Sequence, residues 1–396
     1  MFRRVYLDNA ATTPVDEAVF ESMRPFLTEK FGNPSSIHFF GQEARGAVDQ
    51  ARHQAASILN ADPKEVVFTS GGTESNNLAI KGLAAKQAPD GGHIITSKLE
   101  HPAVISVCED LAGKGYEITV VEAGPQGVVS AAEVAGAVRE DTFLITVMTA
   151  NNEIGTIQPV KQIGRLVADI RSKGRKIWFH TDAVQAIGKI PVDVNEIGCD
   201  LLSFSGHKIY GPKGVGGLFV RRGVRIAAQS LGGHQERETR GGTEAVANIV
   251  ALGKACEIAE EGFLSASKST AAIRRGFEDF VLSEIEGTKL NGCPERRLPN
   301  ISNIAFQGVE GEGLLINLDM QGVAVSTGSA CSSGSIDPSP VILALGVPED
   351  LARGSVRFSF GKFNSADDLD YLKEVVPRAV ENLRKLSPGY QSAPGS

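Results

Sequence analysis

The stretch "DLLSFSGHKIYGPKG" (Asp200–Gly214) joins a β-strand to a lysine that follows the carboxyl end of that strand. The run "DLLSFS" is largely apolar, as expected of a strand that packs on both faces. Lys208 comes directly after it, beside His207 and glycines. A lysine at the dry end of a strand loses its charge readily and can form a Schiff base. An isolated lysine is more often a surface residue, so the rest of the chain must decide between the two.

This strand belongs to a series of short β runs that alternate with helix-like stretches. The other runs are "EVVFTS", "HIITS", "EITVVEA", "FLITVMT" and "KIWFHT". Such alternation predicts an α/β fold with a mainly parallel sheet covered by helices on both faces. After "GVGGLFVRR" the pattern changes to a long helical stretch at roughly 245–259, followed by "ISNIAF", "VRFSF" and a final helix near 368–385. We therefore predict a large domain at 15–260 and a smaller α+β domain formed by 1–14 and 261–396.

Composition excludes several classes of protein. The 396 residues are 42% hydrophobic and 22% charged, which is typical of a folded chain. A net charge of −7 without a dense Lys/Arg run argues against nucleic acid as a direct partner. With no signal peptide and no run of eighteen apolar residues, we expect a cytoplasmic protein without a membrane partner. The five cysteines are scattered without CxxC spacing, which argues against a disulfide framework and against a metal site.

Polar side chains follow the predicted strands where each one ends. In open parallel sheets, ligands bind outside the carboxyl ends of the strands, so these side chains are expected to share one site. In chain order they are Thr73, His101, Asn152, Asp182, Gln185, His207 and Lys208.

The segment "SGGTES" is a candidate phosphate site. Its two glycines, Gly71 and Gly72, lie between a strand and a helix that opens at Thr73. Free N–H groups and the positive end of the helix dipole suit an anion there. Taken alone, this segment is better explained as a plain capped helix start. Together with Asp182 and Lys208, however, a phosphate site completes what pyridoxal phosphate requires, because a carboxylate keeps its pyridine nitrogen protonated.

Two of these residues have simpler explanations. Asp182 in "FHTDAVQA" could be a helix N-cap, which is a common role for aspartate. His101 precedes Pro102 and could cap a helix without any chemical task. In the functional alternative, His101 stacks on the cofactor ring and transfers protons.

The stretch "STGSACSSGS" (Ser326–Ser335) places Cys331 among small residues. Small side chains make few packing contacts, so the sequence predicts a mobile, accessible cysteine loop at about 326–337.

Ten segments in family order resemble the pyridoxal-phosphate cysteine desulfurases of the NifS/IscS type, within the class V aminotransferase fold. The resemblance covers residues 6–387, nearly the whole chain. The segments are "YLDNAATTP", "FGNPSS", "TSGGTESNN", "EH" at 100–101, "NNEIGT", "HTDAVQ", "SFSGHKIYGPKG", "RGGTE", "STGSACSSGS" and "RFSFGKF".

The resemblance implies a fold type I enzyme with a seven-stranded type of sheet and pyridoxal 5'-phosphate as its cofactor. Lys208 would form the Schiff base, Asp182 would face the pyridine nitrogen and Gln185 the ring hydroxyl. His101 would stack on the ring, with Asn152 beside it. The remaining cofactor residues, all assigned to the phosphate, would be Gly72, Thr73, Ser205, His207 and, from the other subunit of a homodimer, Thr243.

The same resemblance implies the reaction. Arg357 and Asn33 would hold the carboxylate of L-cysteine, and Lys208, Cys331 and His101 would be catalytic. Cys331 would receive the substrate sulfur as a persulfide, release L-alanine and serve a sulfur acceptor or iron–sulfur scaffold protein. No resident metal is implied, although the resemblance allows Cys331 to contact an iron–sulfur cluster on a partner.

Three departures from the family pattern concern the details. Val184 stands where Ala or Thr is usual, Gly242 replaces a serine beside Thr243, and the tail after Leu386 is short for docking a scaffold protein. The long cysteine loop argues against the short-loop group that includes selenocysteine lyases. Another class V enzyme, such as a selenocysteine lyase or an aminotransferase, remains the alternative. A third hypothesis is a binding protein without catalytic activity. The presence of Lys208 and Asp182 argues against it.

Overall fold

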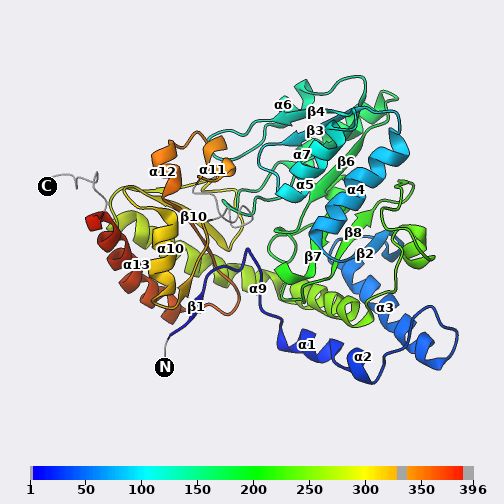
Figure 1. Ribbon diagram of the computed structural model, residues 1–396, viewed down its shortest axis with the longest axis horizontal. Coiled ribbons are helices and arrows are strands. Elements are labelled where there is room, and N and C mark those ends of the chain that lie inside the picture. Colours follow the sequence, from blue (N-terminus) through cyan, green and yellow to red (C-terminus); the bar gives the residue numbers. More distant parts are fainter. Residues whose placement is uncertain (1–2, 328–336, 387–396) are drawn as a thin grey trace.

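The structure is a computed structural model that describes residues 3–327 and 337–386. Its centre is a seven-stranded sheet (Figure 1), in which every strand except β8 runs in the same direction. In spatial order the strands are β2 (Val66–Thr69), β8 (Gly216–Val220), β7 (Leu201–Ser205), β6 (Trp178–Asp182), β5 (Thr142–Thr146), β3 (His93–Ser97) and β4 (Glu117–Val121). The mainly parallel sheet predicted from the sequence is confirmed.

Helices cover both faces of this sheet because its strands carry apolar side chains on both faces. On one face, Val66 and Phe68 belong to a cluster with α3 (Phe39–Ser57), α7 (Val160–Ser172) and the start of α9 (Val246–Glu284). On the other face, Val67 packs with α4 (Gly72–Gln87) and α5 (Pro102–Ala112). The alternation of neighbouring residues between faces is the period-two geometry of a strand. We call this part of the molecule the large-sheet region.

The second part is built around a three-stranded antiparallel sheet of β9 (Thr288–Leu290), β10 (Ile301–Phe306) and β12 (Ser355–Ser359). A short parallel pair lies beside it, formed by β1 (Val5–Tyr6) and β11 (Val323–Ala324). These strands pack with α10 (Gly311–Asp319), α13 (Ala366–Leu386) and the second half of α9 around Phe277, Phe306 and Phe358. We call this part the small-sheet region.

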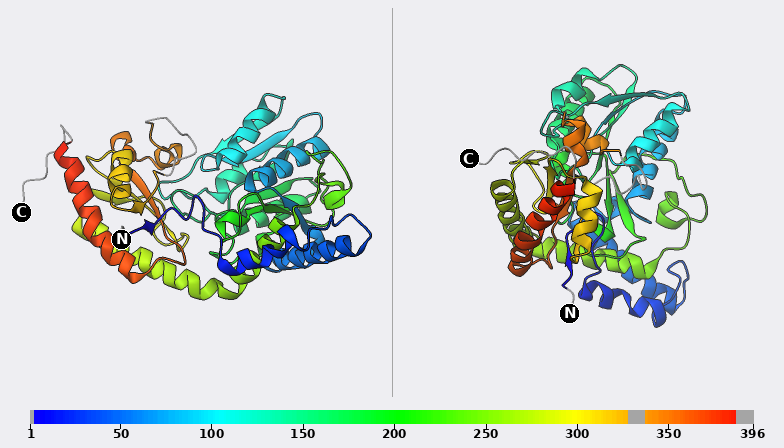
Figure 2. Two further views of the ribbon diagram at one scale, coloured as in Figure 1. Left: turned by 60° about the horizontal axis from the view of Figure 1, so that its bottom comes forward. Right: turned by 60° about the vertical axis from the view of Figure 1, so that its left-hand side comes forward.

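The 39-residue helix α9 extends along both regions (Figure 2). At 1.5 Å per residue it is about 58 Å long. The predicted domain boundary near residue 260 lies inside this helix, so α9 belongs to both regions. Val5 and Leu7 pack in the small-sheet cluster, although they come from the other end of the chain. The division into two domains stays a prediction.

The remaining elements are short. In the part of the chain that the structure describes, no helix has both the length and the apolarity that a membrane span requires. The other helices are α1 (Glu17–Met23), α2 (Pro25–Thr28), α6 (Ala131–Gly136), α8 (Val194–Ile197), α11 (Pro340–Ala344), α12 (Glu349–Arg353) and the 3₁₀ turns η1 (Pro63–Glu65), η2 (Gly206–Lys208) and η3 (Gln235–Glu238).

Candidate active site

Lys208 lies one short turn beyond strand β7, at the end of η2. Its Nζ donates hydrogen bonds to the carbonyl oxygens of Ala10 and Ala11, both at 2.6 Å. These carbonyls belong to the segment Asp8–Thr13, which leaves β1 and passes across the carboxyl edge of the large sheet. The amine is therefore held between the two regions of the molecule.

Asp182 is the last residue of β6 and is buried. Its Oδ2 accepts a hydrogen bond from Asn76 Nδ2 at 2.7 Å, and its Oδ1 accepts one from the backbone N–H of Val184 at 2.9 Å. Both donors are neutral. These two contacts therefore hydrogen-bond the buried Asp182 carboxylate but do not pair it with a cation. A protonated ring nitrogen of a ligand would supply that positive charge.

The position of His101 is compatible with both roles that the sequence left open, the helix cap and the contact with the cofactor ring. It is the N-cap of α5, where Nδ1 accepts a hydrogen bond from the backbone N–H of Ala103 at 3.0 Å. This bond leaves the proton of the neutral ring on Nε2. Burial lowers the pKa of His101, the Asp182 carboxylate raises it and the positive charge of Lys208 lowers it further. The ring thus interacts electrostatically with both groups that the cofactor would contact.

The glycine turn before α4 has the geometry of an anion site. Gly71 has φ 152°, a conformation that L side chains rarely adopt. A Cβ on Gly72 would lie 2.7 Å from Cγ2 of Val184, so only glycine fits there without a shift of Val184. Ser205 Oγ, at the end of β7, is buried and has no hydrogen-bond partner in the described structure. Thr73 is exposed in the first turn of α4.

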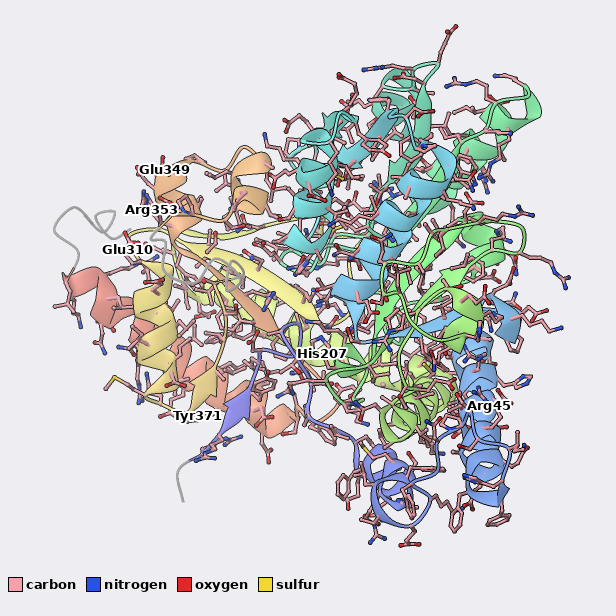
Figure 3. All side chains as sticks on the ribbon, turned by 45° about the vertical axis from the view of Figure 1, so that its right-hand side comes forward. Arg45, His207, Glu310, Glu349, Arg353 and Tyr371 are labelled. Atoms are coloured by element: carbon pink, nitrogen blue, oxygen red, sulfur yellow. The ribbon has the colours of Figure 1, made fainter. Side chains whose placement is uncertain are left out.

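His207 lies beside this turn, between the two regions (Figure 3). Its Nδ1 is 3.2 Å from Thr12 Oγ1, and its carbonyl oxygen accepts a hydrogen bond from the Thr13 N–H. Burial and the positive charges of Lys208, Lys213 and Lys189 lower the pKa of His207 to about 4. A neutral imidazole can donate one hydrogen bond to an anion without bringing a buried charge of its own.

Gln185 and Asn152 complete the centre of the cluster. Gln185 Nε2 donates to the carbonyl oxygen of Ala10 at 2.9 Å, while its buried Oε1 has no partner among the residues described. The carbonyl oxygen of Asn152 accepts a hydrogen bond from Arg357 Nη1 at 2.9 Å. Segments from both sheets therefore meet here.

Arg357 extends from β12 in the small-sheet region and is buried. Its Nη2 forms an ion pair with Asp8 Oδ1 at 2.8 Å, and its Nε has no partner within the described ranges. An incoming carboxylate could compete with Asp8 for this guanidinium.

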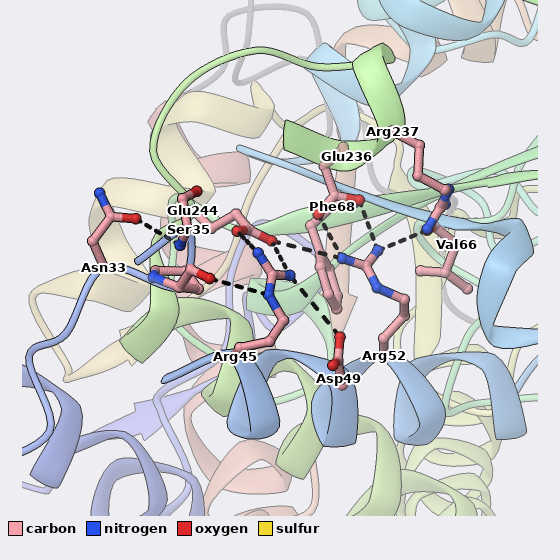
Figure 4. Close-up of polar contacts among 11 residues, drawn as sticks. Asn33, Ser35, Arg45, Asp49, Arg52, Val66, Phe68, Glu236, Arg237 and Glu244 are labelled. Atoms are coloured by element: carbon pink, nitrogen blue, oxygen red, sulfur yellow. Dashed lines mark hydrogen bonds and ion pairs between the residues drawn. The ribbon is translucent and has the colours of Figure 1, made fainter. Parts of the chain in front are cut away.

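Asn33 is exposed and lies with a different group of residues. Its Oδ1 accepts a hydrogen bond from the Ser35 N–H at 2.9 Å, and Figure 4 shows it near Arg45 and Glu244. No contact joins it to Arg357 in the part of this chain that the structure describes. Thr243, next to Glu244, is also exposed. Two assignments therefore stay predictions. One is that Asn33 holds the substrate carboxylate together with Arg357, and the other is that Thr243 binds the cofactor phosphate.

The loop that carries Thr243 is fixed to α3 by a network of ion pairs (Figure 4). Arg52 Nη1 and Nη2 each lie 2.7 Å from a carboxylate oxygen of Glu236, and Arg45 contacts both oxygens of Glu244 at 3.0 and 2.6 Å. Glu236 also accepts a hydrogen bond from the Phe68 N–H of β2. The network holds the loop at the edge strand of the large sheet.

Several residues of the cluster were not predicted as site residues from the sequence. Asp8, Asn76 and the carbonyl of Ala10 each contact a predicted site residue. Asp8 and Ala10 occur in "YLDNAATTP", and their position directly after a short strand was the available signal. Cys331 and residues 328–336 of the predicted cysteine loop lie outside the described residues.

The residues present fit pyridoxal phosphate. Two buried polar atoms without partners in the described structure, Gln185 Oε1 and Ser205 Oγ, lie on segments next to Asp182 and Lys208. The first suits a ring hydroxyl and the second a phosphate oxygen. Asp182 suits the pyridine nitrogen and Lys208 the aldehyde carbon.

Comparison with known proteins agrees with this geometry. The model of the family described as Aminotransferase class-V matches residues 5–372. The chain belongs to the class-V aminotransferase family. Pyridoxal phosphate, predicted from the sequence, is the cofactor of this family of enzymes.

Relatives within the class-V family are similar over nearly their full length. The chain is 50% identical to cysteine desulfurase IscS of Dictyoglomus turgidum over 388 residues, 98% of this chain and 97% of the relative. It is 48% identical to cysteine desulfurase IscS of Methanosarcina thermophila, over 98% of this chain and 94% of the relative. A solved NifS-like protein has 37% identity and a TM-score of 0.88, covering 97% of this chain and 99% of its own. A structure described as SspA in complex with cysteine has 38% identity and a TM-score of 0.80, covering 91% and 100%.

Proposed function

We propose that this chain is a cysteine desulfurase, which converts L-cysteine to L-alanine and retains the sulfur as a persulfide on Cys331. The observation that carries the proposal is the meeting of Lys208, Asp182 and His101 at one sheet edge, in a chain 50% identical to a cysteine desulfurase. One of the similar solved structures is described as a complex with cysteine, which supports this substrate.

Each residue of the site has its own role in the proposed reaction. Bound pyridoxal phosphate withdraws electrons from the substrate Cα. Arg357 binds the substrate carboxylate, with its Nε, which has no partner among the described residues, available as an additional donor. Lys208, once released as a free amine, removes the Cα proton, and the carbonyls of Ala10 and Ala11 hold its Nζ in place. Asp182 balances the positive charge at the ring nitrogen.

The sulfur-transfer step needs no outside oxidant. The thiolate of Cys331 bonds to the substrate sulfur as the Cβ–S bond breaks. The electron pair of that bond stays with the substrate carbon, which takes up a proton and leaves as alanine. The products are a persulfide on Cys331 and L-alanine, and a thiolate is the nucleophile that such an attack requires.

The proposed assembly is a homodimer that passes sulfur to an acceptor or an iron–sulfur scaffold protein in the cytoplasm. Large apolar side chains are exposed around the start of α3, including Ile37 (92% exposed) and Phe39 (74%). Exposed apolar clusters of this kind mark interaction surfaces. Thr243 is exposed, as a residue donated to a second subunit would be in a single chain.

Two variants test the function. Lys208→Ala should lose the covalently bound cofactor, and with it the yellow colour and all alanine formation from L-cysteine. Cys331→Ala should keep the cofactor and its spectral response to L-cysteine while losing sulfide release. Assays of alanine and sulfide, together with mass mapping of the persulfide, measure both effects.

A matched control is Cys293→Ala, which removes a buried cysteine outside the cluster and should leave sulfide release intact. Full sulfide release by Cys331→Ala would show that another residue is the nucleophile. Efficient turnover of selenocysteine with little turnover of L-cysteine would favour the selenocysteine lyase alternative. Amino transfer to an oxo acid would favour the aminotransferase alternative.

A further inference from the structure

A cavity of about 420 Å³ lies between the two regions, beside the middle of α9. The large-sheet region contributes Lys189, Ile209 and Tyr210, the small-sheet region contributes Asn300 and Phe360, and α9 contributes Phe263. Of the predicted site residues that the structure describes, Lys208 lines the cavity, whereas Asp182, His101, Ser205 and Thr73 do not, so the cavity lies next to the site that would hold the cofactor rather than within it. Its volume is in the range of sites that bind small molecules.

The charged groups on the cavity wall are all cationic. Lys189, Lys208 and Lys362 line it, and its lining contains no Asp or Glu. Lys362 is paired with Asp16, and Lys208 Nζ is turned toward Ala10 and Ala11. Lys189 is therefore the lysine that an anion in the cavity would meet.

Lys189 has no ion pair with a carboxylate within residues 3–327 and 337–386. Its Nζ donates a hydrogen bond to the carbonyl oxygen of Lys208 at 3.2 Å. Burial, together with the positive charge of Lys208, lowers the pKa of Lys189 to about 7. A buried ammonium without a counterion is unfavourable, and a bound anion would remove that penalty.

Asn300 provides a second, independent indication of a ligand. Its side chain is 3% exposed, and neither Nδ2 nor Oδ1 has a hydrogen-bond partner in the described structure. Its backbone, in contrast, is bonded, because the carbonyl accepts from the Phe360 N–H at 2.8 Å. Buried amides are normally satisfied, and each unmade bond is costly. Asn300 also lines the cavity, so its amide is a candidate hydrogen-bonding group for an occupant.

Much of the rest of the wall is apolar, although hydroxyl and amide side chains also line it, namely Asn9, Thr13, Ser265, Ser267, Ser269 and Thr270. Ile209 and Phe360 come from the two regions, and Ile258, Phe263 and Ala266 come from α9. An occupant with a hydrocarbon or aromatic body would bury this surface, at roughly 25 cal/mol for each Å² removed from water. The wall is therefore suited to an amphiphilic ligand rather than to a simple inorganic ion.

We propose that this cavity binds a small organic carboxylate with an apolar body, its carboxylate paired with Lys189 and hydrogen-bonded by Asn300. The apolar body packs between α9 and Phe360. Because the occupant contacts both regions, and because Lys189 holds the Lys208 carbonyl, binding acts on the same backbone that positions the catalytic lysine. Binding of the carboxylate does not depend on the proposed desulfurase reaction, although the cavity and the proposed active site share Lys208.

The test uses octanoate as the probe and the cofactor-loaded enzyme, with binding measured by isothermal titration calorimetry. Octanoate should bind with one site per chain and a Kd below about 1 mM. Lys189→Met keeps the stem but removes the charge, and should weaken binding at least about tenfold, the effect of one charge-assisted hydrogen bond. Ala266→Phe should fill the cavity and abolish binding. Octan-1-ol should bind at least about tenfold more weakly than octanoate.

Lys268→Met is the matched control, because Lys268 is exposed on α9 and does not line the cavity. It should bind octanoate as the wild type does, and the cofactor absorbance of each variant reports that it is folded. The proposal is overturned if the wild type binds no octanoate at 10 mM, a concentration about tenfold above the expected Kd limit. Unchanged affinity in both Lys189→Met and Ala266→Phe also overturns it, since octanoate would then occupy another site, such as Arg357.

Discussion

At the scale of single residues, Glu100 places a carboxyl group in the interior directly before His101. Its Oε1 accepts hydrogen bonds from Ser97 Oγ at 2.6 Å and from the Met148 N–H at 2.8 Å, while Oε2 has no partner in the described structure. Burial raises the pKa of Glu100 to about 8, although the two hydrogen bonds lower it. The folded protein therefore keeps this side chain protonated at neutral pH.

Glu100→Gln should change how stability depends on pH. Between pH 4.5 and 8 the unfolded chain has lost the Glu100 proton and the folded chain has kept it, so wild-type stability falls as pH rises through this window. Glutamine has no proton to lose. The free energy of unfolding of the variant, relative to wild type, should rise by up to about 1.4 kcal/mol per pH unit up to pH 8 and then stay constant.

Urea denaturation at several pH values between 5.5 and 9 measures this difference. Glu109→Gln, an exposed substitution on α5, is the control and should give a curve parallel to that of the wild type. A parallel curve for Glu100→Gln as well would show that Glu100 ionises in the folded protein as it does in the unfolded chain.

The residues at the sheet edge were predictable for one reason. Lys208 and His101 follow a strand and Asp182 is the last residue of one, and the carboxyl ends of parallel strands meet at one edge. Asp8 was not predictable in this way, since it reaches Arg357 across 349 positions of sequence. Lys189 was not among the predicted residues, because its place in the cavity depends on the packing of α9 beside it.

At the scale of elements, α3 and the loop before α9 are joined by charge rather than by apolar packing. Arg52, whose side chain is 9% exposed, packs its guanidinium 4.6 Å from the centre of the Phe68 ring and pairs with Glu236. Glu236 and Arg237 have left-handed φ values of 45° and 56°. Such a backbone persists only where its surroundings hold it, and the ion pair supplies that restraint.

Arg52→Met should destabilise the protein by about 3–5 kcal/mol, because it leaves the buried Glu236 carboxylate without the cation that balances its charge. The double variant Arg52→Met/Glu236→Gln should recover part of this loss, since the unpaired charge is gone. Urea denaturation measures both. Arg24→Met, which breaks an exposed pair with Glu21, is the control and should change stability by less than about 1 kcal/mol.

An effect of Arg52→Met no larger than that of Arg24→Met would mean that the network does not hold the loop. The same variants bear on Thr243, which lies seven residues after Glu236. If Thr243 binds a phosphate of the second subunit, Arg52→Met should also weaken cofactor retention, as measured by the cofactor absorbance after dialysis.

The order of the elements could be predicted better than their lengths. The strand series and the final helix were evident from hydrophobic periodicity. The sequence suggested a helix at about 245–259, whereas α9 continues to Glu284. Its later turns, including "EEGFLSASKST", are polar and small because they line the cavity and the surface, so they show little helical periodicity.

At the scale of the whole molecule, exposed apolar side chains concentrate around the start of α3. Phe31 and Phe40 stack with ring centres 5.7 Å apart, and Phe39 contacts Phe40 at 5.9 Å. Together with Ile37 they form an exposed apolar surface, and the proposed homodimer would use it as its interface. This surface lies on the α1–α3 side of the large-sheet region (Figure 1).

The double variant Ile37→Glu/Phe39→Glu should shift the protein from dimer to monomer, because charges replace the apolar centre of the interface. Light scattering coupled to gel filtration measures the mass. Met320→Glu, an equally exposed apolar position on α10, is the control and should remain dimeric. If the Ile37→Glu/Phe39→Glu variant stays dimeric, the interface lies elsewhere on the molecule. If the wild type is a monomer at micromolar concentration, the proposed dimer does not form.

The segment Asp8–Thr13 has a consequence for how the chain is made. β1 pairs with β11, and Asp8 pairs with Arg357, so β1 can find its partner only after residue 324 has been synthesised, and Asp8 only after residue 357. At 5–20 residues per second this wait is on the order of 20–70 s. During that time the sheet of the large region can form, but the carbonyls that hold Lys208 are not yet fixed by β12. Cofactor capture is therefore expected to follow release of the finished chain, and a nascent chain arrested before β12 should not become coloured.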